Sequence, residues 1–148
     1  MSEKNISAST PLDACRMIKL PQINSGLGNL TFAETVNHVQ FDIQRAYIVT
    51  DVPDGAVRGG HAHKALWQLL ICAQGSCKVS LSDGQKKADY LLSEPNQGLI
   101  IGPAVWRDLA FMSEHKAVLL VLASDHYDER DYIRSYQEFS AWSAHNGN

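Results

Sequence analysis

The residues best suited to chemistry in this chain are His61 and His63, which follow two glycines and precede an apolar run at 66–73. In an extended strand, residues i and i+2 point to the same face, so the two imidazoles would share one space. Paired histidines commonly bind a metal or move protons near neutral pH. The spacing leaves both uses open, together with a structural use in which the rings only line a barrel.

The spacing around this pair resembles the first motif of the cupin superfamily. Five residues separate a glycine from His61, four separate His63 from Gln68, and six separate Gln68 from the next glycine. For metal-binding cupins, the resemblance implies a glutamate ligand at the position of Gln68 and a third histidine after a later proline. Here that later region runs from Gly102 and holds no histidine, and Arg107 stands near the expected place.

The donor types at these positions argue against a metal. An arginine side chain carries only donors and stays protonated, so Arg107 cannot ligate a cation. A neutral amide at Gln68 is a weaker ligand than a carboxylate. Two histidines, an amide and a guanidinium suit an anion or a polarised carbonyl oxygen better than a divalent cation. We therefore expect no metal and no cofactor.

Short strands and frequent turns make up most of the chain and would position these residues. In one strand, Arg45 and Tyr47 share a face by the period of two. The pattern predicts an all-β sandwich or barrel, with a jelly-roll as the natural case and only a closing loop or short helix near the C-terminus. The expected strands are 15–20, 30–34, 41–50, 66–73, 75–81, 87–92, 99–101 and 116–124, with turns at 24–29, 51–55, 83–84 and 95–98.

Length and composition indicate one domain. We expect a single domain at 14–142, between a flexible leader at 1–13 and a flexible tail at 143–148. The net charge of -3 and the lack of a basic block argue against nucleic acid as a partner. The apolar runs are too short to cross a bilayer, and no signal-peptide core stands near the start. The three cysteines are expected to be free thiols. These features predict a cytoplasmic protein.

Four stretches resemble the sugar 3,4-ketoisomerases. They begin at Arg58 (RGGHAHK), Cys72 (CAQGSC), Gly98 (GLIIGPAVW) and Leu122 (LASDHYDERDYIR), and the last is the most specific. The resemblance implies a homodimeric, metal-free cupin jelly-roll. It implies conversion of dTDP-4-keto-6-deoxyglucose into its 3-keto isomer, on the route to 3-amino-3,6-dideoxy sugars of surface glycans, such as lipopolysaccharide O-antigen, or of secondary metabolites.

The resemblance also implies roles for residues. The paired histidines of the family match His61 and His63, its strand residues near the sugar match Arg45 and Tyr47, and its arginine before the histidines matches Arg58. A histidine is well suited to the proton transfers because its unperturbed pKa is about 6.5. We expect His63 to carry the proton between C3 and C4, while His61 shuttles the hydroxyl proton or orients its neighbour.

Charge on the enediolate oxygen needs fixed donors. The candidates are Arg107, Gln68, Arg45 and Tyr47. Some family members carry histidine at the position of Arg107, which leaves the C4 configuration of the product open, and a larger polar residue is expected at Leu27. Three other functions stay open: a metal-dependent cupin oxygenase, a sugar-nucleotide 3,5-epimerase and a non-catalytic sugar-nucleotide-binding cupin.

Overall fold

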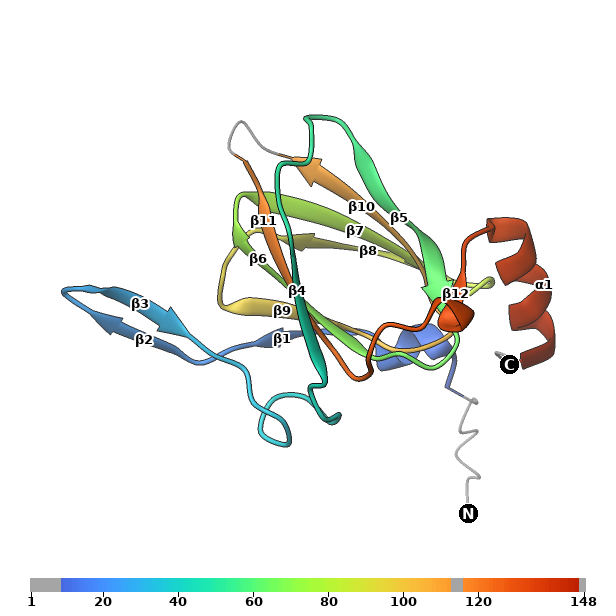
Figure 1. Cartoon of the computed structure of the whole chain (residues 1–148), viewed down its shortest axis with the longest axis horizontal. Helices are drawn as coiled ribbons and strands as arrows, with labels where there is room; N and C mark the ends of the chain where they lie inside the picture. The colour runs from blue at the N-terminus through green and yellow to red at the C-terminus, as the bar shows by residue number, and fades with distance from the viewer. Residues whose placement is uncertain (1–8, 113–115, 147–148) are drawn as a thin grey trace, which may run out of the picture.

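The computed structural model of the chain describes residues 9–112 and 116–146, which form short strands and one helix of any length (Figure 1). The strands are β1 (Arg16–Lys19), β2 (Gln22–Ser25), β3 (Gly28–Thr31), β4 (Arg45–Val49), β5 (Val57–His63), β6 (Gln68–Gln74), β7 (Ser76–Ser82), β8 (Lys87–Leu92), β9 (Gln97–Ile101), β10 (Trp106–Met112), β11 (Val118–Ala123) and β12 (Tyr132–Ile133). The helical segments are the 3-10 turns η1 (Pro11–Ala14) and η2 (Glu129–Asp131) and the helix α1 (Tyr136–Asn146).

Two antiparallel five-stranded sheets face each other and enclose the core. One has the order β1-β9-β6-β11-β4 and the other the order β12-β5-β10-β7-β8. The hairpin of β2 and β3 projects away from both sheets, and α1 lies beside β12 at the opposite side of the molecule (Figure 1). This arrangement confirms the predicted all-β jelly-roll with a short C-terminal helix.

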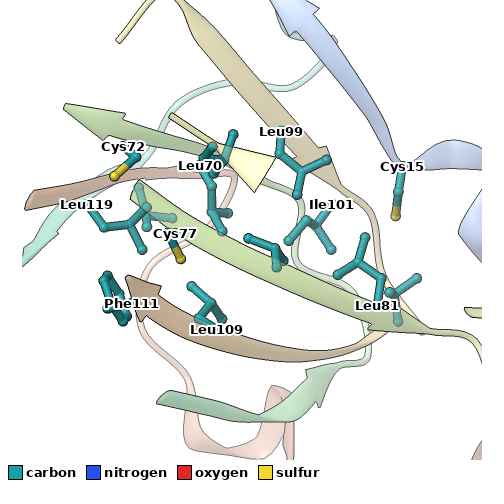
Figure 2. Packing of buried hydrophobic residues seen from close by; sticks show 14 of the residues in the cluster. Cys15, Leu70, Cys72, Cys77, Leu81, Leu99, Ile101, Leu109, Phe111 and Leu119 are labelled. Carbon is teal, nitrogen blue, oxygen red and sulfur yellow. The ribbon is translucent and has the colours of Figure 1, made fainter. Parts of the chain in front are cut away.

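The inward faces of the two sheets form one apolar core (Figure 2). In β7, Cys77, Val79 and Leu81 are buried, as the alternation in the sequence predicts. In β6, Leu70 joins this core, while Leu69 packs on the outer side of the same sheet in a second cluster. A strand that is apolar on both faces is therefore covered on both faces. The three cysteines are buried and free, as expected.

Three local expectations were wrong. Residues 106–112 form strand β10, which the sequence analysis did not predict because adjacent Arg107 and Asp108 interrupt the apolar alternation. The turn expected at 24–29 is much shorter, because residues on both sides pair in the β2–β3 hairpin. The strand expected at 41–50 begins only at Arg45, within β4. The described residues hold twelve strands.

The ordered domain is longer than expected at both ends. Helix α1 runs to Asn146, and within it Ser143 is 3% exposed, so the boundary placed at residue 142 is too early. A Cβ on Gly84 would lie 2.7 Å from Ser143 Oγ, which shows how closely the β7–β8 turn approaches the helix. Leu12 in η1 is also buried, so the chain already packs on the domain before residue 14. Residues 1–8 and 147–148 lie outside the described residues. No helix of the described chain is long and apolar enough to span a membrane.

Candidate active site

Strand β5 brings the two histidine rings together, as its alternation predicts. The ring centroids of His61 and His63 lie 4.9 Å apart in an edge-to-face arrangement. Arg107 on β10 pairs directly with His61 across the strands, so the position near which a metal-binding cupin would place its third histidine does adjoin the pair. Gly59 permits this close pairing, because a Cβ there would lie 2.8 Å from the Arg107 carbonyl oxygen.

His63 is held from behind by a carboxylate. Its side chain is 1% exposed, and its Nδ1 lies 2.9 Å from Asp131 Oδ2 in η2. The backbone N–H of Ala65 donates to Asp131 Oδ1 at 2.8 Å, which fixes the carboxylate. An ionised carboxylate only accepts hydrogen bonds, so Nδ1 carries the hydrogen and a neutral His63 ring presents a lone pair at Nε2. Buried Nε2 has no partner among the described residues.

Tyr132 on β12 packs against both histidines. Its ring centroid lies 5.1 Å from that of His61 and 4.4 Å from that of His63, and β12 pairs with β5 at His63. The guanidinium of Arg134 lies over the Tyr132 ring, 4.2 Å from its centroid. The sequence alone did not indicate a site role for Asp131 or Tyr132. The available signal was their place in the most specific stretch of the resemblance.

A second polar cluster lies inside the barrel and consists of Tyr47, Gln68 and Arg107. The Arg107 Nη1 donates to Gln68 Oε1, and Gln68 Nε2 donates to the Tyr47 hydroxyl at 2.9 Å. Arg107 also donates from Nη2 to the Val105 carbonyl at 3.1 Å. Gln68 and Arg107 are each 2% exposed. The two side chains expected in place of metal ligands are therefore hydrogen-bonded to each other.

Burial and one fixed positive charge set the electrostatics of the histidines. Burial, with the charge of Arg107 adding to it, lowers the pKa of His61 to about 4. Burial and then the charge of Arg107 also lower the pKa of His63. Burial lowers the pKa of Arg107 itself to about 10, which still leaves it charged at neutral pH. The site therefore holds two neutral imidazoles beside a guanidinium cation.

Two hollows meet the histidine pair. A cleft of about 890 Å³ is lined by His63, Arg45, Asp131 and Tyr132 together with residues of the 124–130 loop. An inner cavity of about 70 Å³ is lined by residues of both sheets, namely Tyr47, Val49, Arg58, Gly59, His61, Gln68, Leu70, Arg107, Leu109, Phe111, Leu119 and Val121. Ligand sites usually measure about 300–1,000 Å³, so the cleft is large enough for the main part of a ligand, whereas the inner cavity can take only a small group that reaches inward past the histidines.

Arg45, Arg58 and Leu27, the other residues singled out from the sequence, lie in three different parts of the structure. Arg45 lines the cleft with its guanidinium 5.4 Å from the Tyr47 centroid and 5.8 Å from that of Tyr127, and its buried Nε has no partner among the described residues. Arg58 lines the inner cavity but is an exposed residue. Leu27 is fully exposed at the tip of the projecting β2–β3 hairpin (Figure 1).

The donor set at the centre does not suit a metal ion. The described residues contain no group of three or more histidine, cysteine, aspartate or glutamate side chains placed to hold one. Where metal-binding cupins have a carboxylate ligand, Gln68 has its amide oxygen turned to Arg107 and its amide nitrogen turned to Tyr47. A cation at this place would meet a buried positive charge at Arg107 instead of a negative ligand.

Comparison with known proteins identifies the family. The profile of the family described as FdtA (WxcM-like, C-terminal) matches residues 13–144. The chain belongs to this family. This FdtA-family chain is 41% identical over 129 residues to the TDP-4-oxo-6-deoxy-alpha-D-glucose-3,4-oxoisomerase of Aneurinibacillus thermoaerophilus, covering 87% of this chain and 92% of the relative. The resemblance seen in the sequence is thereby confirmed.

Solved structures of similar proteins agree with this assignment. The sugar 3,4-ketoisomerase QdtA of Thermoanaerobacterium thermosaccharolyticum, in complex with TDP, is 41% identical with a TM-score of 0.85, covering 90% of this chain and 96% of QdtA. A histidine-to-asparagine mutant of QdtA was crystallised with TDP-4-keto-6-deoxyglucose. The 3,4-ketoisomerase of Helicobacter canadensis is 39% identical with a TM-score of 0.84, covering 88% of this chain and 97% of that one. A sugar epimerase at 16% identity shares the fold alone.

Proposed function

We propose that this FdtA-family chain is a sugar-nucleotide 3,4-ketoisomerase that moves the keto group of TDP-4-keto-6-deoxyglucose from C4 to C3 without a metal or cofactor. One observation carries the assignment to this site. Among the described residues, buried side-chain nitrogens without a partner occur at Arg45 Nε, His63 Nε2 and Arg107 Nε, all at or beside the histidine pair. Native proteins leave few buried polar groups unsatisfied, and such groups mark places that a ligand or a reaction completes.

The chemistry of these three atoms matches a keto sugar. Arg45 Nε and Arg107 Nε are N–H donors that need oxygen acceptors, and a neutral His63 offers at Nε2 a lone pair that needs a proton. A sugar with a ketone beside a carbon bearing a hydroxyl supplies both oxygen acceptors and an acidified C–H. Because the donors are fixed by the fold before the substrate binds, they need no reorganisation when charge develops on oxygen.

The reaction needs no oxidant or reductant. A base removes the C3 proton, and the electron pair of the C–H bond forms the C3–C4 double bond while the C4 carbonyl becomes an enediolate oxygen. The proton then returns at C4, and the hydrogen of the C3 hydroxyl passes to the C4 oxygen. The product carries the ketone at C3 and a hydroxyl at C4, with the same atoms as the substrate.

The two histidines divide the proton transfers. His63 carries the proton between C3 and C4, because Asp131 holds its Nδ1–H and leaves Nε2 free as the acceptor. His61 shuttles the hydroxyl proton or orients His63, because it lies edge-to-face with His63 and beside the inner cavity. Tyr47, Arg45 and Arg107 stabilise charge on the sugar oxygens.

The nucleotide part of the substrate would occupy the 890 Å³ cleft, with the sugar directed to the histidine pair. Arg58 is the proposed contact for the diphosphate because its guanidinium is exposed, although Arg58 lines the inner cavity and not the cleft. The cleft also offers Arg130 and the aromatic ring of Tyr127. The family relative QdtA was crystallised with TDP and, as a mutant, with TDP-4-keto-6-deoxyglucose, which supports this choice of ligand.

The decisive experiment incubates the protein with TDP-4-keto-6-deoxyglucose in deuterated buffer and follows the sugar by NMR. We expect a 3-keto product with exchange confined to C3 and C4, and the configuration at C4 follows from the same spectra. Deuterium at C5 would instead identify a 3,5-epimerase, and an unchanged sugar would contradict catalysis on this substrate. Elemental analysis of the same sample tests the metal: stoichiometric iron, manganese, nickel or zinc would contradict a metal-free mechanism.

The assembly and setting complete the proposal. A homodimer is supported by the large apolar side chains that the β2–β3 hairpin exposes at Ile23, Leu27 and Leu30, between 56% and 101%. Sedimentation velocity tests it, and a monomer at micromolar concentration would contradict it. The enzyme would act in the cytoplasm and supply a 3-keto sugar to an aminotransferase that makes a 3-amino-3,6-dideoxy sugar for surface glycans, such as the O-antigen, or secondary metabolites. Cell fractionation tests the location.

A further inference from the structure

Gln68 stands at the centre of a hydrogen-bond chain that crosses the barrel interior between the two sheets. Arg107 on β10 lies at one end of the chain, and Tyr47 on β4 lies at the other. Gln68 is 2% exposed, and both polar ends of its amide are bonded within the protein. One of its two amide N–H donors and its amide oxygen are thus engaged inside the protein, which fixes the orientation of the amide.

The direction of every hydrogen bond in this chain follows from the chemistry of Arg107. A guanidinium only donates, so the Gln68 group that faces it must be the amide oxygen. The amide nitrogen then faces Tyr47 and donates to the hydroxyl oxygen at 2.9 Å. Since that oxygen is an acceptor in this bond, the Tyr47 hydrogen must point elsewhere. The described part of the chain gives it no acceptor, and Tyr47 lines the inner cavity beside His61.

We propose that Gln68 is a positioning residue that turns the Tyr47 hydroxyl hydrogen away from the barrel wall, so that Tyr47 donates to the sugar oxygen that becomes charged in the enediolate. Its effect on turnover rests on the isomerase function proposed above. The positive charge of Arg107 acts on that oxygen through the amide and the phenol, each of which polarises the next donor.

A glutamate at this position would reverse the chain. Its carboxylate accepts from Arg107 and also from the Tyr47 hydroxyl, which would turn the phenol hydrogen toward the barrel wall. Gln68→Glu is therefore a sharper variant than a truncation, because it keeps the size of the side chain, gives Arg107 a charged partner and reverses the direction of the hydrogen bond to Tyr47. Gln74→Glu, at the exposed far end of the same strand β6, is the matched control.

The first readout is kinetic. We expect Gln68→Glu and Tyr47→Phe each to lower kcat about a hundredfold, the usual scale for losing one oxyanion donor, with little change in KM. The double variant should be no slower than the slower single variant, because both changes remove the same donor. Gln74→Glu should retain the wild-type kcat. A wild-type kcat in Gln68→Glu, or losses that multiply in the double variant, would overturn the proposal.

The second readout is independent of activity. In protein with carbon-13 at tyrosine Cζ, the Tyr47 resonance is identified by its loss in Tyr47→Phe. Burial raises the pKa of the Tyr47 phenol, while the Gln68 hydrogen bond lowers it. Gln68→Glu should raise this phenol pKa further, because the phenol would then donate to a carboxylate. An unchanged or lower phenol pKa would overturn the proposed direction.

A third measurement uses only the wild-type protein and Tyr47→Phe, so it does not depend on the folding of the glutamate variant. The NMR signal of the Gln68 amide proton that faces Tyr47 should shift upfield when the phenol acceptor is removed. Unchanged amide chemical shifts in Tyr47→Phe would overturn the proposal. If wild-type protein fails to isomerise the sugar while both NMR readouts come out as expected, the function proposed above fails and the hydrogen-bond direction stands.

Discussion

Two turns of this molecule each contain an aspartate whose carboxylate accepts backbone N–H groups: Asp83 is buried and Asp131 is partly buried. In η2, Asp131 accepts the Ala65 N–H with one oxygen and holds His63 with the other. In the turn between β7 and β8, Asp83 accepts the N–H groups of Gln85 and Lys86 with one oxygen, at 2.9 and 2.8 Å. Its other oxygen accepts the Leu12 N–H at 3.3 Å.

The difference lies in what the second oxygen meets. At Asp83 it meets the backbone of η1, so the carboxylate ties the N-terminal segment to the barrel and has a structural role. At Asp131 it meets a titratable ring whose other nitrogen is free, so the same local device fixes a tautomer. A carboxylate held by backbone N–H groups thus becomes part of a candidate active site through its partner and not through its own turn. The comparison predicts that changes at Asp131 mainly lower turnover, whereas changes at Asp83 mainly lower the free energy of unfolding.

The largest effect should come from the ring that Asp131 holds. His63→Asn should lower turnover by at least about a hundredfold, the usual scale for losing a general base. The measurement is the rate of 3-keto product formation, with His145→Asn on exposed helix α1 as the control that keeps wild-type turnover. If His63→Asn has normal turnover and His61→Asn does not, His61 is the base instead of His63. Asp131 would then not support the catalytic base.

Asp131→Asn should have the next largest effect on activity. An amide can present its N–H₂ to His63 and so favour the wrong tautomer, and loss of such a supporting partner typically costs about 10- to 100-fold. Steady-state kinetics measure the loss in kcat, and urea unfolding of the same sample measures its stability. A variant that loses stability but keeps its turnover per folded molecule would make Asp131 a structural residue like Asp83.

Asp83→Asn should lower stability and leave activity unchanged. It keeps an acceptor but replaces the charged oxygen facing Leu12, so we expect a loss of about 1–3 kcal/mol in the free energy of unfolding, with unchanged turnover below the unfolding range. Burial alone would raise the pKa of Asp83, but the N–H groups of Lys86 and Gln85 hold it below its usual value.

The sign of its pH dependence follows from that lowered pKa. The stability that Asp83 provides is fully present above the unfolded pKa of about 3.9 and is lost as the pH falls through the lower folded pKa. Urea unfolding at neutral and acidic pH should therefore show a gap between wild type and Asp83→Asn that narrows toward low pH. A gap that widens in acid would contradict this assignment.

The smallest expected effect is on the pH profile. The base must be neutral, and burial and Arg107 lower the pKa of both histidines. The acidic limb of kcat/KM should therefore lie below pH 6.5, and kcat/KM should stay constant as the pH falls from 8 to 6.5. Arg107→Gln should move the limb upward by about one pH unit, since a nearby positive charge is removed. A wild-type limb at or above pH 6.5 would contradict the electrostatics of the site.

The sequence by itself determined the parts of this protein that depend on local periodicity and residue chemistry. A period of two places His61 and His63 on one face, and the donor types of Gln68 and Arg107 argue against a metal, whichever way the barrel closes. The all-β pattern, the β7–β8 hairpin and the family resemblance also follow from residues close together in the chain. Strand β10 was not predicted because its inward-facing residue Arg107 is charged. A charged residue usually indicates an exposed position, so the sequence pattern did not indicate a buried strand.

Only the tertiary structure decided which groups complete the site. Asp131 stands 68 residues after His63, and their contact exists because β12 adds to β5 at the edge of the second sheet. The direction of the Arg107–Gln68–Tyr47 chain likewise requires three strands from two sheets to meet. Neither the His63–Asp131 contact nor the Arg107–Gln68–Tyr47 chain can be predicted from the spacing of residues in the sequence. Strand order is set by packing across the whole barrel and not by separation along the chain.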